Sequence, residues 1–82
     1  MNQTRNVKRH SGRALQLSPR EREVLGHFAT GFTYAQIANR MGITRHTVDT
    51  YLRRVREKTG ACSGAELTRL AVVLEMLDGD DA

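Results

Sequence analysis

Helix starts occur in this sequence in one repeated form, a Ser or Thr followed three residues later by Glu or Gln. Such a pair is a capping box, in which the two side chains satisfy backbone N–H groups at the beginning of a helix. The chain holds three of them: Ser18 with Glu21, Thr33 with Gln36, and Ser63 with Glu66. Thr44 supplies a further N-cap, and a glycine suited to ending a helix follows each segment: Gly31, Gly42, Gly60 and Gly79. The sequence therefore predicts an all-α protein with helices over about 18–30, 34–41, 45–59 and 64–77.

The loops between these segments are short. Three residues, "GIT", separate the second segment from the third, which is the turn length found in a helix-turn-helix. At 82 residues the chain can bury one small core. We expect a four-helix, bundle-like helix-turn-helix domain over 17–77. A flexible basic arm would precede it at 1–16, where bases occur without an acid, and an acidic tail would follow it at 78–82.

Charge and composition favour a polyanionic partner over a catalytic role. The net charge is +4 and the pI about 10, and most of the cations are Arg, whose planar fork suits phosphates and base edges. The three His are scattered, and the single cysteine, Cys62, can neither close an internal disulfide nor complete a zinc motif. We expect no enzyme activity, no metal and no cofactor. Because no apolar run has the length of a signal or membrane segment, we expect a cytoplasmic protein.

The third predicted helix has two contrasting faces. Val48, Leu52 and Val55 fall on one side at helical spacing, with Tyr51 on its shoulder, and must face the core. The opposite side carries the candidates for contact with DNA bases, which are His46, Asp49, Thr50 and Arg53.

Side-chain chemistry suggests how this outer face would read bases. Arg53 can bond to guanine O6 and N7, Thr50 can offer a hydroxyl or a methyl group, and Asp49 can accept from cytosine N4. Asp49 and Arg53 are also spaced to pair within the helix, which needs no DNA. Base contact and pairing within the helix can both occur, because the pair can hold Arg53 in an orientation suited to contact a base.

Hydroxyls, cations and helix N-termini nearby could position a DNA backbone without reading its sequence. The candidates for phosphate contact are Thr33, Thr44, Arg45, Thr47, Arg54 and Lys58. For each of them an ordinary cap or a solvated charge is the alternative.

From Leu17 to about Leu74 the chain resembles the LuxR-type (GerE-like) helix-turn-helix domain of bacterial transcription regulators, in its stand-alone form. The resemblance is carried by "LSPREREVL", "IANRMGIT" with "TV" two residues on, "EKTG" and "AEL". It implies a DNA-binding domain whose third helix enters the major groove and whose fourth commonly forms a two-fold dimer contact. It also implies base reading by Asp49, Thr50 and Arg53, with Thr47 and Lys58 near phosphates. The sequence departs from the family where Asp49 replaces a common lysine, where Tyr51 replaces a common histidine, and where Cys62 and Gly64 replace common basic residues.

The last predicted helix carries two apolar stripes. One is sufficient for packing on the domain: Leu67, Leu70, Ala71 and Leu74. The second is the predicted dimer interface: Val73, Met76 and Leu77. The alternative is that this second stripe packs against the arm or the first helix.

Together these features predict a sequence-specific regulator of transcription that binds double-stranded DNA, as a homodimer on a pseudo-palindromic site. The competing hypothesis is a protein-interaction module for RNA polymerase, a sigma factor or an anti-sigma-like partner, because the promoter-reading domain of sigma factors shares this helix arrangement.

Overall fold

The computed structural model describes residues 16–81 and confirms the all-α prediction. It contains four helices, α2 (Pro19–Thr30), α3 (Tyr34–Met41), α4 (Arg45–Thr59) and α5 (Gly64–Asp81), and no strand occurs within the described residues. Apart from Gln16, the predicted arm at 1–16 lies outside the described part of the chain. Each predicted helix is thus present within one residue of its expected start.

The predicted caps at the N-termini of the helices are all formed. Ser18 Oγ accepts from the Glu21 N–H at 3.1 Å, and the Glu21 carboxylate accepts from the Ser18 N–H at 2.9 Å. The same reciprocal bonds join Thr33 with Gln36 and Ser63 with Glu66. Because these bonds satisfy backbone donors that have no partner inside the helix, they fix where each helix begins.

Gly42 makes the turn between α3 and α4 possible. Its φ of 68° lies in the left-handed region, which residues with a Cβ atom adopt only at a cost. The next N–H, that of Ile43, bonds to the Ala38 carbonyl at 3.0 Å, so the end of α3 is closed before the chain leaves it. Thr44 then caps α4. A short, well-bonded turn therefore sets α4 against α3.

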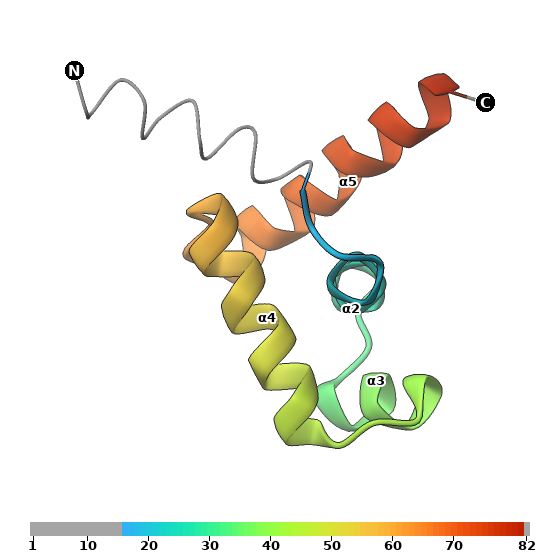
Figure 1. Cartoon of the computed structure of the whole chain (residues 1–82), viewed down its shortest axis with the longest axis vertical. Helices are drawn as coiled ribbons and strands as arrows, with labels where there is room; N and C mark the ends of the chain where they lie inside the picture. The colour runs from blue at the N-terminus through green and yellow to red at the C-terminus, as the bar shows by residue number, and fades with distance from the viewer. Residues whose placement is uncertain (1–15, 82) are drawn as a thin grey trace.

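Helix α2 is the central element of the fold. It contacts α3, α4 and α5, and Figure 1 shows it end-on between α4 and α5, with α3 beneath it. Two apolar clusters meet on it. The first joins α2, α3 and the first half of α4, and the second joins α2, the end of α4 and α5. Burying each large aliphatic side chain of these clusters stabilises the fold by roughly 1.5–3 kcal/mol.

The helical spacing of apolar residues predicts an inward face on each of the four helices, and most of the buried residues lie on these faces. Leu17, which precedes α2, is an additional buried residue, whereas Leu70 and Ala71 on the predicted face of α5 are only half-buried. The first cluster consists of Val24, Ile37, Ala38, Met41, Val48 and Leu52. The second consists of Leu17, Leu25, Val55, Leu67 and Leu74. Phe28, also predicted to face inward, is half-buried and packs against both clusters.

The end of α5 differs from the prediction. The helix continues beyond Leu77 and through Gly79 to Asp81, so residues 78–81 of the predicted acidic tail belong to the helix. A glycine inside a helix costs only about 1 kcal/mol relative to alanine and ends the helix only when it turns left-handed. No proline follows Gly79 to stop the helix.

Candidate nucleic-acid interface

Helix α4 is held by its apolar face and leaves its polar face open. Val48, Leu52 and Val55 are fully buried, each with none of its surface exposed. On the other side, His46 and Arg53 are exposed, and Asp49 and Thr50 are half-buried. The structure therefore brings the four predicted base-contacting residues together on the outer face of one helix.

Asp49 and Arg53 form the ion pair that their spacing allows. Arg53 Nη2 lies 2.5 Å from Asp49 Oδ2, and the two side chains are 55% and 41% exposed. A pair this exposed adds little stability, since water and salt screen it. Its consequence is geometric, because the carboxylate holds one end of the guanidinium while the other donors stay available.

The threonines on α4 are bonded to their own helix. Thr50 Oγ1 donates to the His46 carbonyl at 3.1 Å, so its hydroxyl hydrogen is committed, while its oxygen can still accept and its methyl group can still make apolar contact. Thr44 Oγ1 accepts from the Thr47 N–H at 3.0 Å and lies 2.9 Å from Thr47 Oγ1. The hydroxyl groups of Thr44 and Thr47 therefore lie together at the N-terminus of α4.

The predicted phosphate contacts differ in their surroundings. Arg45 and Arg54 are exposed and make no hydrogen bond or ion pair with any residue from 16 to 81. Thr33 lies apart from α4, at the N-terminus of α3, where its hydroxyl accepts from the Gln36 N–H at 3.1 Å. The two arginines are therefore among the cations of α4 that are available to an anion.

Lys58 has a partner inside the protein. Its Nζ donates to Glu21 Oε1 at 2.8 Å, and the Glu21 side chain is only 4% exposed. Burial raises the pKa of the Glu21 carboxyl, but hydrogen bonds from Lys58 and Ser18, with the Lys58 charge, outweigh it and hold the pKa below its usual 4.5. Glu21 is thus a buried carboxylate whose ionised form is favoured.

The sequence analysis assigned Glu21 only to a cap and missed this contact. A signal was present, because Glu21 lies three and four residues before Val24 and Leu25, on the inward side of α2. A carboxylate on such a side needs a cation from another element.

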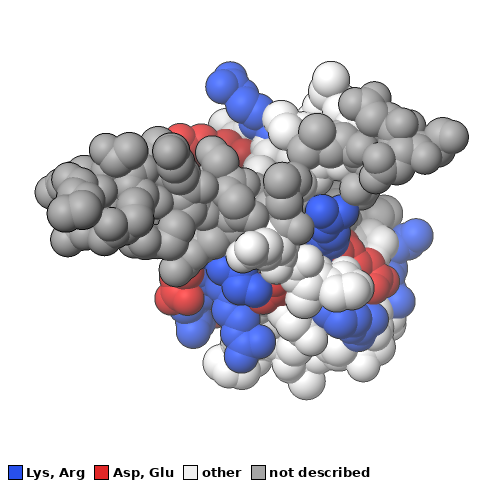
Figure 2. Space-filling view, turned by 45° about the horizontal axis from the view of Figure 1, so that its top comes forward, with Lys and Arg blue, Asp and Glu red and all other residues white. Residues whose placement is uncertain are grey.

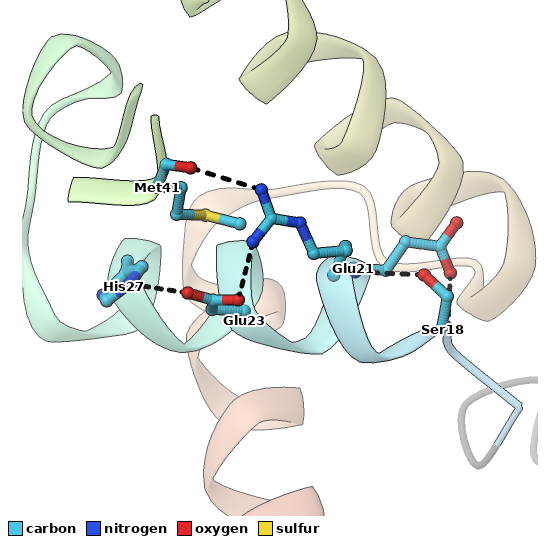
Figure 3. A network of polar contacts seen from close by, with 6 residues as sticks. Ser18, Glu21, Glu23, His27 and Met41 are labelled. Carbon is cyan, nitrogen blue, oxygen red and sulfur yellow. Dashed lines mark hydrogen bonds and ion pairs between the residues drawn. The ribbon is translucent and has the colours of Figure 1, made fainter. Parts of the chain in front are cut away.

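Arg20 is a second residue that the sequence analysis did not single out. Its guanidinium lies between Glu23 Oε1 at 3.2 Å and the Met41 carbonyl at 3.3 Å, so it links α2 to the end of α3 (Figure 3). Arg40 lies over the Phe32 ring, 4.4 Å from its centroid. Both arginines are used within the domain and support α3, on which α4 rests.

The basic surface is not continuous. On the face that Figure 2 displays, acidic side chains lie among the basic ones. Arg45 and Arg54 are nine residues apart on α4, which places them on opposite sides of the helix, so these free arginines do not form one continuous basic patch either.

Residues 16–81 lack the features of a metal site and of a membrane-spanning helix. No group of three or more His, Cys, Asp and Glu side chains among them is arranged to hold a metal ion. None of the helices in this range has both the length and the apolar character needed to cross a bilayer.

A family comparison agrees with this geometry. Residues 15–71, more than half of the chain, match the GerE model, described as bacterial regulatory proteins of the luxR family. The chain belongs to the luxR family. The match covers α2, α3, α4 and the first half of α5, and it supports DNA-binding transcription regulation as the general function.

Several individual regulators are similar to this luxR-family chain. The transcriptional activator protein YukR of Yersinia ruckeri is 42% identical over 67 residues, which are 82% of this chain and 29% of YukR. The tetrathionate response regulatory protein TtrR of Salmonella typhimurium is 46% identical over 54 residues, 66% of this chain and 26% of TtrR. The transcriptional regulatory protein FixJ of Azorhizobium caulinodans is 39% identical over 66 residues, 80% of this chain and 31% of FixJ.

The chain therefore spans about a quarter to a third of the length of these relatives. No solved structure gives a significant match.

Proposed function

We propose that this luxR-family domain regulates transcription by binding double-stranded DNA in a sequence-specific manner, with α4 in the major groove. The observation that carries the proposal is the arrangement of α4, whose back is fully buried while its polar and basic face stays open. In a helix-turn-helix the second helix enters the major groove, and its N-terminal turns reach base edges. Here α3, the Gly42 turn and α4 are the corresponding elements.

Base reading is assigned to the outer face of α4. Arg53 would donate to a guanine edge, and Asp49 would keep its guanidinium aligned and accept from a cytosine amino group. Thr50 would contact a thymine methyl, since its hydroxyl hydrogen is already bonded to the helix. His46 lies one turn before Thr50 on the same face and would contact the adjoining base edge.

Backbone contact is assigned to the free cations and to the helix starts. Arg45 and Arg54 would each neutralise a phosphate, and Thr44, Thr47 and Thr33 would add contacts at the N-termini of α4 and α3. Each neutralised phosphate releases counterions, so the logarithm of the binding constant should fall linearly with the logarithm of salt concentration.

A homodimer through α5 would complete the proposal. Val73 and Met76 are 44% and 65% exposed, and Val72, which the sequence analysis did not include, is 49% exposed. The third predicted member, Leu77, has a side chain outside the part that the structure describes. A contiguous apolar patch on one helix suits a two-fold contact, which would present two copies of α4 to a pseudo-palindrome.

Selection of bound duplexes from a random pool, followed by binding at several salt concentrations, tests the proposal. We expect a two-fold symmetric sequence and a binding constant that falls steeply with salt. Recovery of unselected sequences would remove the specificity claim. Absence of salt-dependent duplex binding would remove the DNA claim and leave RNA polymerase or a sigma-type partner as the alternative.

A further inference from the structure

Glu21 is the one charged or polar residue that is buried within residues 16–76, with 3% of its surface exposed. Its capping role needs only contact with Ser18, and an exposed cap would serve equally well. Burying a carboxylate is costly unless a cation and hydrogen bonds compensate it. The position of Glu21 therefore calls for an explanation beyond the start of α2.

A single oxygen of Glu21 joins two elements that are far apart in the sequence. Oε1 accepts from the Ser18 N–H at 2.9 Å and from Lys58 Nζ at 2.8 Å, across a separation of 37 residues. Figure 3 shows Ser18 and Glu21 together at the N-terminal end of α2. The start of α2 and the last turn of α4 are thus tied through one atom.

The contact between Glu21 and Lys58 lies beside the second apolar cluster. Leu25 is one turn after Glu21 on α2, and Val55 is one turn before Lys58 on α4, and both are buried in this cluster. Apolar contacts are non-directional and tolerate small rotations of one helix on another. A charged hydrogen bond requires a defined distance and angle, so it fixes the orientation that the apolar contacts leave open.

We propose that Lys58 is a positioning residue for DNA recognition, which sets the orientation of α4 through Glu21 instead of contacting a phosphate. The inference rests on the proposed function, because orientation matters only if α4 reads bases. A phosphate contact would make the Lys58 ammonium share its charge between two anions and so weaken its compensation of the buried Glu21 carboxylate. The free Arg54, four residues earlier on α4, carries no such cost.

Two substitutions separate positioning from phosphate contact. Glu21→Gln keeps the capping box, since Gln serves at this position, but removes the charge that holds Lys58. Under the proposal, Glu21→Gln and Lys58→Met both lower the ratio of specific to random duplex binding, on the order of tenfold, the cost of one imperfect base contact. Neither substitution changes the salt slope, which is the slope of the logarithm of the binding constant against the logarithm of salt concentration. Arg54→Ala, the matched control, lowers that slope by about 1 and weakens all duplexes alike.

A phosphate-contacting Lys58 gives the opposite results. Lys58→Met would then reduce the salt slope as Arg54→Ala does, and Glu21→Gln, by releasing Lys58, would strengthen binding to every duplex. Either outcome overturns the proposal. A role in stability alone would leave the specificity ratio of the folded variants unchanged, which also overturns it; circular dichroism at the binding temperature establishes that they are folded.

The double variant Glu21→Met/Lys58→Met removes both charges and keeps an apolar contact. We expect it to recover part of the affinity lost in Lys58→Met, because no uncompensated carboxylate remains. No recovery would contradict the pairing. If the wild-type domain itself shows no salt-dependent duplex binding, the proposed function fails, whereas a reduced salt slope in Lys58→Met defeats only the positioning role.

Discussion

At the scale of single residues, the outer face of α4 places an acid where only cations would be expected on a DNA-binding helix. Asp49 pairs with Arg53 through a 2.5 Å contact between exposed side chains. Screening makes this pair a weak source of stability. Its effect is to restrict the rotamers of a long side chain, so that the proposed contact of the guanidinium with a base would cost less entropy.

Arg53→Ala tests base reading by this pair. We expect the variant to lose about 1–3 kcal/mol of binding free energy on the preferred site and to relax the preference at one base pair. Titrations of specific and random duplexes provide the measurement, and Arg69→Ala, an exposed arginine on α5, is the control. Equal losses on both duplexes would show that Arg53 contacts only the backbone.

The Glu21–Lys58 pair makes stability depend on pH. Because the pKa of folded Glu21 lies below its usual 4.5, the ionised form stabilises the fold fully above pH 4.5. That contribution is lost as the pH falls through the lowered pKa. Urea unfolding from pH 7 to about pH 3 should therefore show an acid-side loss that Glu21→Gln reduces. An unchanged acid limb in Glu21→Gln would mean that other carboxyls carry this dependence.

At the scale of the elements, most of the fold follows from local chemistry. Capping pairs and glycines gave the helix starts and three of the ends, because each of these signals acts within a few residues. Helical periodicity likewise identified the buried side of α4, and hence the outer face with Asp49, Thr50 and Arg53.

Local signals in the sequence did not predict contacts between residues that are far apart in the chain. Nothing local places Lys58 beside Glu21, or Arg20 on the Met41 carbonyl. Such contacts depend on how the helices cross. Sequence reasoning therefore located the outer face of α4, the proposed recognition surface, but not the polar contacts that support it.

Gly42 tests the turn that joins α3 and α4. Gly42→Ala should destabilise the domain by about 1–2 kcal/mol, since its φ of 68° is costly for an L-residue. No atom lies within 4 Å of the added Cβ, so strain alone is measured. Gly26→Ala is the matched control. It also has open space around its Cβ but lies within α2, where alanine should stabilise by about 0.5–1 kcal/mol. Similar effects of the two substitutions on urea unfolding would contradict this explanation.

At the scale of the whole molecule, the recognition surface and the exposed apolar patch lie on different helices. Helix α4 carries the polar face, and α5 carries the patch formed by Val72, Val73 and Met76. Helix α2 contacts both helices, and α5 runs away from the end of α4 toward its own C-terminus (Figure 1). The two surfaces can therefore be tested independently, and a dimer through α5 leaves the outer face of α4 open.

Charge on the apolar patch should prevent association. Val73→Asp and Met76→Asp should each lower the molar mass measured by light scattering towards that of a monomer, because a buried unpaired carboxylate is costly. Asn39→Asp, at an exposed position of α3, is the control and should leave the mass unchanged. A monomeric wild-type protein would refute the homodimer without affecting DNA binding by a single domain.

Chemical-shift mapping of the amide groups during titration with a selected duplex tests the central claim most directly. If α4 occupies the major groove, the largest changes will fall on residues 45–54, with smaller ones at the start of α3 and few on α5. Large changes elsewhere, with α4 unperturbed at saturation, would contradict the assignment of α4 as the DNA-reading helix.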